Sequence, residues 1–329
     1  MKIVVDAMGG DHAPRAVIEG VVEAYKELDI HIALVGIEEK IREELKRLSF
    51  SHPNLEIIHA PEVVGMEEPA TTSIRQKKDS SISVGINLLK DKQYDAFVSA
   101  GNTGAVVAAS TVFLRMLPGV DRPAIGIAIP TLKKFSFLID AGANTEPKPE
   151  HLLHSAQLAR VYVREVLGVS NPTIGLLNIG EEEGKGSGFQ KETYKLMEAK
   201  LKNFIGNVEA NEVFTGKSDC IICDGFIGNV VLKVAEGLLE STGKLMKREI
   251  KKNPFAILGA LILKLSLKDI RKLADYSEYG GAPLLGVNGI VMISHGRSNP
   301  KAIKNAIKAA CREVEHKILD IMIKEVKDS

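Results

Sequence analysis

Short apolar segments that end in Gly, Asn or Asp recur along the chain and alternate with stretches of helical periodicity. The apolar segments are KIVVDAMGG, IHIALVG, LEIIHAPE, YDAFVSAGN, FSFLIDAGAN, PTIGLLNIG and DCIICDG. The helical patterns cover residues 14–28, 38–48, 80–90, 103–114, 150–167, 189–201, 229–252 and 300–327. Strands that are apolar on both faces and alternate with helices are typical of a parallel sheet covered on both sides. The sequence therefore predicts an α/β fold with a mostly parallel sheet.

One pair of apolar segments departs from this alternation. AIGIAIP and FSFLIDA are separated only by TLKK, which is too short for a helical crossover and predicts an antiparallel hairpin. The chain shows no internal repeat and no low-complexity linker, and only the Pro-rich stretch 146–150 resembles a boundary. We therefore expect residues 1–329 to form a single α/β/α domain.

Composition excludes several classes of partner and compartment. The 43 Lys and Arg against 42 Asp and Glu leave a formal net charge of +1, and Trp is absent, so a nucleic-acid binder is not expected. The apolar stretch before Asp6 is too short for the core of a signal peptide. The three cysteines fit a reducing compartment, and Cys220 and Cys223 lie in a buried-strand pattern that favours buried thiols over a metal site. We expect a cytoplasmic protein.

Gly, Asn and Asp gather directly after five of the predicted strands. The five junctions are Asp6–His12, Ser99–Gly104, Asp140–Asn144, Asn178–Gly188 and Asp224–Asn229. Ligands of parallel α/β sheets bind outside the carboxyl ends of the strands, where helix N-termini offer free N–H groups to anions. The same residue types are ordinary turn formers, but five junctions together favour a cleft for an anionic or polar ligand.

The known nucleotide and nucleophile motifs fail at these junctions. No G-x-G-x-x-G follows the first strand, and Gly180–Lys185 is one residue short of a G-x-x-x-x-G-K-[ST] loop. No G-x-S-x-G nucleophile elbow is present either. We therefore expect a phosphate-like ligand without a cofactor or metal, and a substrate that supplies its own nucleophile. Lys185 and the run Arg75–Lys78 are the candidate cations.

The segment 244–275 differs from the rest of the chain in charge and pattern. Residues 244–272 contain nine Lys or Arg and two acidic residues, so this stretch has a formal charge of +7 and the rest of the chain −6. It encloses an uncharged run at 254–263 that is too short to span a bilayer. The pattern predicts a protruding basic amphipathic helix, which could contact an anionic membrane, dock an acidic carrier protein or pack in a dimer. The predicted docking residues are Phe255, Leu258, Leu261, Ile262, Lys264, Lys268 and Arg271.

Long motifs, distributed from the first residue nearly to the last, resemble one known family. They are MKIVVDAMGGDHAP, Met66…Pro69…Arg75-x-Lys77…Ser80-Ser81, SAGNTGA, DRPA, DAGAN, NIGEEEGKG, CDGFIGN, YGGAPLLGVNG, SHGRS and SNPKAIKNAI. In this order they resemble the PlsX family of bacterial phosphate acyltransferases. The resemblance implies a homodimer with a Rossmann-like α/β/α fold that reversibly transfers a long-chain acyl group from acyl carrier protein to inorganic phosphate. The acyl phosphate would serve a membrane glycerol-3-phosphate acyltransferase, so peripheral membrane association is expected.

We assign roles on this chemistry from the residues themselves. Lys185, with Arg75 or Lys77, is expected to hold phosphate, because an anion at glycine-rich strand ends needs a cation. The carbonyl oxygen is expected to bind Asn102 and Asn229, and a phosphate proton to move through Asp11 or His12. The predicted catalytic residues are Lys185, Asp11, His12 and Asn229. The predicted substrate-binding residues are Gly9, Gly10, Arg75, Lys77, Ser99, Gly101, Asn102, Thr103, Asn144, Asn178 and Asp224.

Three other functions stay open at this point. A phosphate acyltransferase could use acyl-CoA as donor instead of acyl carrier protein. A NAD-dependent decarboxylating dehydrogenase could share the fold, although the dinucleotide fingerprint is missing. A non-catalytic membrane adaptor would not need five polar strand ends.

Overall fold

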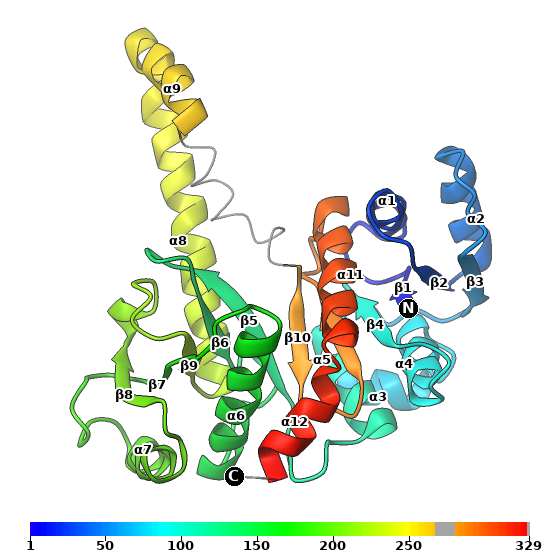
Figure 1. Ribbon diagram of the computed structural model, residues 1–329. Helices are drawn as coiled ribbons and strands as arrows, with labels where there is room; N and C mark the ends of the chain where they lie inside the picture. Colours follow the sequence, from blue (N-terminus) through cyan, green and yellow to red (C-terminus); the bar gives the residue numbers. More distant parts are fainter. Residues whose placement is uncertain (267–279, 328–329) are drawn as a thin grey trace.

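The computed structural model describes residues 1–266 and 280–327. Within these residues one sheet runs through the molecule in the order β3-β2-β1-β4-β11-β10-β5-β6-β9-β7-β8 (Figure 1). Parallel pairs flank an antiparallel stretch from β11 to β6, so the predicted α/β fold with a mostly parallel sheet is confirmed. The strands are β1 Lys2–Asp6, β2 His31–Gly36, β3 Leu55–His59, β4 Ala96–Ser99, β5 Ala124–Pro130, β6 Phe135–Ile139, β7 Ile174–Asn178, β8 Phe204–Glu209, β9 Cys220–Ile222, β10 Ala282–Leu285 and β11 Ile290–Ile293.

Helices cover both faces of the sheet. On β1, Ile3 and Val5 belong to the core that α1 and α11 cover, whereas Val4 between them packs in a second core with α4. Such a strand is apolar at every position because both of its faces are buried. The helices are α1 Arg15–Tyr25, α2 Glu38–Arg47, α3 Ala70–Gln76, α4 Ser81–Lys90, α5 Thr103–Ala109, α6 Pro149–Glu165, α7 Gly188–Lys200, α8 Gly225–Lys251, α9 Pro254–Ser266, α11 Pro300–Glu315 and α12 Ile318–Lys327.

Three consecutive antiparallel pairs, which include the hairpin of β5 and β6, reverse the strand direction between the two halves of the sheet. The two strands pair antiparallel, as the TLKK spacing predicts, and β10 is antiparallel to both β11 and β5. Consequently β6, β9, β7 and β8 run opposite to β1, β4 and β11. Through the pairs Ile139–Gly126 and Pro283–Met292, the end of β6 at Ile139 is level with Met292, one residue or ~3.4 Å from the end of β11 at Ile293. α8 follows β9 and rises beside the hairpin (Figure 1).

A few elements differ from the sequence-based expectation. The helix predicted at 300–327 is two helices, because Lys317 takes a φ of 49° between α11 and α12. The helix predicted at 103–114 ends as α5 at Ala109 and continues as a wider π-type turn, Ser110–Leu114. α3 is only seven residues long and β8 contains Gly206 at φ 91°, so neither gave a clear pattern. That the chain is a single domain stays a prediction.

α8 and α9 project out of the body of the molecule (Figure 1). Only Gly225 and Gly228 of α8 are buried, and α9 packs back against α8. We call residues 237–266 the arm. The predicted protruding helical segment is confirmed for residues 244–266, and its remainder, 267–275, lies outside the described residues. Among the helices described, none combines the length and hydropathy needed to cross a bilayer.

Candidate active site

A buried carboxylate organises the loop after β1. The Asp6 Oδ2 accepts a hydrogen bond from the Ser99 hydroxyl (2.7 Å). The Ser99 Oγ in turn accepts one from the Gly101 N–H (3.0 Å). Desolvation raises the pKa of Asp6. A Cβ at Gly9 would lie 2.5 Å from both the Asp6 Oδ2 and the Gly101 nitrogen, so a larger residue does not fit. The predicted glycines at the ends of β1 and β4 therefore pack against each other.

The loop after β11 joins this unit through backbone hydrogen bonds. The Asp11 N–H donates to the Gly296 carbonyl, and the Ser294 N–H donates to the Ser99 carbonyl, both at 2.8 Å. Gly10 has a φ of 102°, which side chains disfavour. Three loops, after β1, β4 and β11, thus hold one another in place.

A second buried carboxylate organises the turn after β6. The Asp140 Oδ1 accepts the Gly142 N–H (3.0 Å) and its Oδ2 accepts the Asn144 N–H (2.7 Å), while desolvation raises the pKa of Asp140. The start of α8 lies directly against this turn, because a Cβ at Gly228 would lie 1.9 Å from the Asp140 carbonyl oxygen. Asp224 caps α8 by accepting an N–H of its first turn (2.8 Å).

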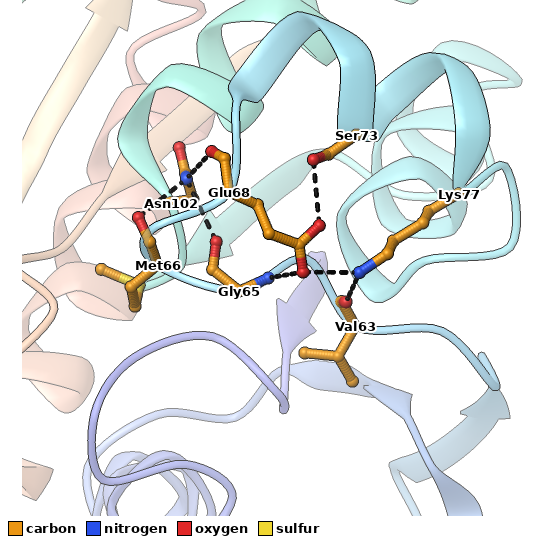
Figure 2. A network of polar contacts seen from close by, with 7 residues as sticks. All are labelled: Val63, Gly65, Met66, Glu68, Ser73, Lys77 and Asn102. Atoms are coloured by element: carbon orange, nitrogen blue, oxygen red, sulfur yellow. Dashed lines mark hydrogen bonds and ion pairs between the residues drawn. The ribbon is translucent and has the colours of Figure 1, made fainter.

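Figure 2 shows how Asn102 fastens the segment before α3. Its Nδ2 donates to the carbonyl oxygens of Gly65 (3.2 Å), Met66 (3.0 Å) and Glu68 (3.0 Å), and its Oδ1 caps α5. Lys77 donates to the Glu68 carboxylate (2.6 Å), and this interaction holds the pKa of Glu68 at about 2. The network places Met66 in the wall of a cavity.

This cavity, of about 540 Å³, lies between the loops and α8. Its volume is typical of sites for small molecules. Both halves of the sheet contribute, through the loops after β1 and β11, the starts of α5, β5 and β10, the turn after β6 and the first turns of α8. The lining residues are Asp11, Met66, Glu67, Thr103, Gly104, Ile125, Ile127, Ala128, Ala141, Gly142, Asn229, Leu232, Lys233, Glu236, Gly281, Ala282, Ile293, Ser294, His295, Gly296, Arg297, Ser298 and Ala302.

Charged side chains of both signs gather in the cavity around His295. Lys233 and Glu236 of α8 form an ion pair (Nζ–Oε2 2.9 Å), and Arg297 and Asp11 come from the loops. Desolvation lowers the pKa of His295; Glu236 and Asp11 oppose this shift, and Lys233 and Arg297 reinforce it. The imidazole is therefore mainly neutral at pH 7 and can accept a proton.

Another part of the wall is apolar. Ile125 and Ile127 of β5, Leu232 of α8 and Ile293 of β11 line the same cavity. An apolar surface beside convergent charges can bind a ligand that has both an anionic and a hydrocarbon part.

The structure brings only some of the predicted residues to this cavity. Asp11, Thr103 and Asn229 line it directly. A second group is outside the lining and shapes the loops around it through the contacts described above. This group consists of Gly9, Gly10, Ser99, Gly101, Asn102, Asn144 and Asp224.

Five of the predicted side chains lie outside the cavity lining. Lys185 follows β7, two strands from β6, and its Nζ is 3.7 Å from the Glu182 carboxylate. Asn178 fixes that loop by donating to the Lys185 carbonyl (3.2 Å). Lys77 is engaged by Glu68, and Arg75 and His12 are exposed; none of the five lines the cavity. Their contact with phosphate stays a prediction that the lining does not support, since the strands that the five junctions follow span eight positions of the sheet, from β1 to β7.

Sequence reasoning missed several side chains of the cavity. Lys233 and Glu236 follow Asn229 by four and seven residues, so they share a helix face with a residue that was predicted. His295 and Arg297 follow a strand end, as the other junction residues do, but the apolar run before them was not included among the junctions. Both signals were present in the sequence.

Only some of the predicted docking residues have side chains that the structure describes, and these lie on the arm. Phe255 is 83% exposed and Leu258 is 58% exposed. For Leu261, Ile262 and Lys264 only the helical backbone is described. Lys268 and Arg271 lie outside the described residues. Cys220 and Cys223 are buried thiols, as expected.

Comparison with known proteins gives consistent findings. The family model described as "Fatty acid synthesis protein" matches residues 1–320. A protein named phosphate acyltransferase from Alkaliphilus oremlandii is 48% identical over 97% of this chain and 96% of its own length. One of the same name from Dictyoglomus turgidum is 49% identical over 97% of each chain.

Solved structures show the same fold at low identity. A phosphotransacetylase from Streptococcus pyogenes has a TM-score of 0.64 at 16% identity, over 96% of this chain and 94% of that one. A 4-hydroxythreonine-4-phosphate dehydrogenase from Klebsiella pneumoniae has a TM-score of 0.54 at 13% identity, over 95% and 99%. The dehydrogenase alternative thus shares the fold, whereas the relatives with high identity are named as transferases. With a family model across nearly its whole length and relatives near half identity, the chain belongs to the PlsX family of phosphate acyltransferases.

Proposed function

We propose that this acyltransferase moves a long-chain fatty acyl group reversibly from acyl carrier protein to inorganic phosphate and releases acyl phosphate. The observation that carries the proposal is the composition of the cavity. Arg297 and Lys233 lie in the same cavity as the apolar side chains of Ile125 and Ile127. An acyl thioester and a phosphate need such a pair of environments, because one is hydrocarbon and the other is an anion.

Phosphate itself is the nucleophile in this mechanism. A serine nucleophile needs a base within hydrogen-bonding distance, and within the described residues the Ser294 and Ser298 hydroxyls have no partner. A phosphate oxygen attacks the thioester carbonyl carbon, and the new C–O bond gives a tetrahedral oxyanion. Collapse of this intermediate breaks the C–S bond and releases the thiolate. A thiol with a pKa of about 8.5 leaves with little acid assistance.

The cavity residues divide this work. Arg297 and Lys233 neutralise and orient phosphate, and the Asn229 amide donates to the oxyanion. The neutral His295 or the Asp11 carboxylate takes up the phosphate proton and returns it to the thiolate. Asn102, whose amide donates to three backbone carbonyls, acts as a positioning residue rather than as a donor to the substrate.

The donor can be identified by direct comparison. Phosphate-dependent turnover should be measured with one acyl chain attached either to acyl carrier protein or to coenzyme A, at matched concentrations. We expect the carrier-protein thioester to have the higher kcat/KM. A higher kcat/KM for the coenzyme A thioester would replace the proposed donor and leave phosphate as acceptor.

The arm supports the proposed partners. The exposed apolar side chains that α8 contributes to the arm, among them Leu238 and Leu245, suit a second copy of the chain in a homodimer. Phe255 and Leu258 at the tip, beside basic residues, suit an anionic membrane surface. We propose a cytoplasmic enzyme that associates peripherally with the membrane and supplies acyl phosphate to the membrane glycerol-3-phosphate acyltransferase. Docking of the acidic carrier protein on the same basic surface is the competing role.

A further inference from the structure

Two serine side chains in the cavity wall have no hydrogen-bond partner. Ser294 is 3% exposed and Ser298 is 4% exposed, and they flank the segment that carries His295 and Arg297. Within the part of the chain that the structure describes, neither hydroxyl is paired. Leaving a buried hydroxyl unpaired is unfavourable, and such groups are uncommon in folded proteins. Two in one wall, on both sides of a cation, indicate a ligand that pairs with them.

The backbone of these serines is fixed while their hydroxyls are not. The Ser294 N–H donates to the Ser99 carbonyl (2.8 Å) and the Ser298 N–H to the His295 carbonyl (2.9 Å). A Cβ at Gly281 would lie 3.3 Å from the Ser294 Oγ, so the glycine leaves space around this hydroxyl. Because no hydrogen bond holds either side chain in its rotamer, a turn toward the cavity costs little. The hydroxyl of Ser99, in contrast, is held by Asp6 and Gly101.

The surroundings suit a small oxyanion. Both serines line the cavity next to Arg297, and α11 begins two residues after Ser298, so the positive end of its dipole lies beside this segment. A hydroxyl can donate to a phosphate oxygen or accept the proton that a phosphate carries near pH 7. We propose that the Ser294 and Ser298 hydroxyls bind the inorganic phosphate directly, together with the Arg297 guanidinium. The inference rests on the proposed function and assigns residues to its acceptor subsite.

The test compares three serine-to-alanine variants of the full chain. Ser294→Ala and Ser298→Ala remove the proposed ligands. Ser110→Ala is the matched control, because the Ser110 hydroxyl is also buried and has no partner among the described residues, but lies outside the cavity lining. We expect the first two variants to raise the KM for phosphate about tenfold or more, the effect of losing a hydrogen bond to a charged group, with the KM for the acyl donor unchanged. Ser110→Ala should retain the wild-type value.

Thermal unfolding supplies a second readout that a structural role would not give. In phosphate-free buffer all three variants should have a Tm equal to or above that of the wild type, because each loses an unpaired buried hydroxyl. With saturating phosphate, the wild type and Ser110→Ala should gain more in Tm than the two cavity variants.

Each other outcome overturns the inference. An unchanged phosphate KM in both cavity variants excludes the hydroxyls from the subsite. A lower kcat with an unchanged phosphate KM assigns them to the thioester carbonyl instead, and a lower Tm in phosphate-free buffer shows that they support the fold. If the wild-type chain transfers no acyl group to phosphate, the proposed function itself fails, and this result is distinct from the others.

Discussion

The body and the arm use apolar residues for different purposes. In the body Ile3, Ile32 and Leu34 are fully buried. In the arm Leu238 and Leu245 are 66% and 51% exposed. Apolar burial of about 25 cal/mol per Å² stabilises the body on folding, whereas the arm recovers this energy only when it meets a partner. Composition alone does not separate the two, since both regions are rich in Leu and Ile.

One helix passes from the first environment into the second. The first turns of α8 are packed so closely that Cβ atoms at Gly225 and Gly228 would collide with Asp140 or Asn144, and the next turns line the cavity. Farther along, a Cβ at Gly237 or Gly243 would meet no atom of the described residues within 4 Å. We infer from this contrast that the tightly packed part of α8 positions the groups of the active site, whereas the exposed part associates with partners. Four predictions test this division.

The largest effect should follow loss of the cation in the cavity. Arg297→Ala should lower phosphate-dependent turnover by about a hundredfold or more, the usual cost of removing a group that stabilises developing charge. Sedimentation with anionic liposomes should be unchanged, because the arm is untouched. Steady-state kinetics and liposome binding of one preparation measure both.

Lys185→Ala is the matched control for that prediction. Lys185 is also a cation in a glycine-rich loop, but it does not line the cavity, so turnover should stay within about threefold of the wild type. A collapse of activity in Lys185→Ala, with Arg297→Ala near normal, would restore the sequence-based assignment and contradict ours.

Two glycines of α8 should respond to alanine in opposite directions. Gly228→Ala introduces a Cβ that meets the Asp140 carbonyl at 1.9 Å, so the free energy of unfolding should fall by about 3 kcal/mol or more. Gly243→Ala meets no neighbour in residues 1–266 and 280–327 and should raise the free energy of unfolding by up to about 1 kcal/mol, through helix propensity. Urea unfolding gives both values. Equal destabilisation by the two variants would mean that the arm is as tightly packed as the body.

The tip of the arm should control membrane binding without controlling chemistry. The double variant Phe255→Glu, Leu258→Glu should lose about tenfold or more in affinity for anionic liposomes, because charge replaces exposed apolar surface. Its turnover with dissolved substrates should stay close to the wild type. Leu132→Glu alters an exposed leucine of the body (89%) and should leave flotation unchanged. Undiminished flotation of the double variant would remove the membrane role from this surface.

The smallest effect concerns the pH dependence of stability. Glu313 of α11 is buried beside Tyr162, and desolvation raises its pKa from 4.5 to about 8. Between these values the unfolded chain ionises while the folded chain keeps the proton, so stability falls as pH rises from about 4.5 to 8. Glu313→Gln removes this loss, and its advantage over the wild type should grow from pH 5 to pH 8.

An exposed glutamate of the arm provides the comparison. The Lys244 hydrogen bond lowers the pKa of Glu240, so its small contribution is present above about pH 4.5 and lost only on acidification. Glu240→Gln should therefore show no trend between pH 5 and pH 8. The difference in urea midpoint between each variant and the wild type, measured from pH 5 to pH 8, checks both expectations. A difference that does not change with pH for Glu313→Gln would contradict the buried state of that carboxyl.

The fold was largely predictable because its signals are local. The apolar run of β1 and the TLKK turn each follow from a few neighbouring residues. The break at Lys317 was not predictable, since a left-handed residue between two apolar helical patterns leaves no composition signal. The offset of the two half-sheets depends on the register of β10 against β5 and β11, which no single segment encodes.

The site was only partly predictable for the same reason. Asp11, Thr103 and Asn229 follow strand ends and line the cavity. Lys185 also follows a strand end, but the sheet order puts β7 two strands from β6. Lys77 was predicted as a phosphate ligand from its charge, and only the structure shows the Glu68 carboxylate that engages it. The positions of residues after strand ends indicate candidate site residues. The order of the strands in the sheet and the ion pairs of the side chains determine which of these residues lie in the cavity.

The central claim is that phosphate attacks an acyl thioester in the cavity of the body. The most direct measurement incubates the chain with acyl-acyl carrier protein and radiolabelled inorganic phosphate, and follows label in a lipid-extractable product. We predict enzyme-dependent labelling that matches the release of free carrier thiol one to one and is lost in Arg297→Ala. Release of carrier thiol without labelled product, or full labelling by Arg297→Ala, would contradict the account.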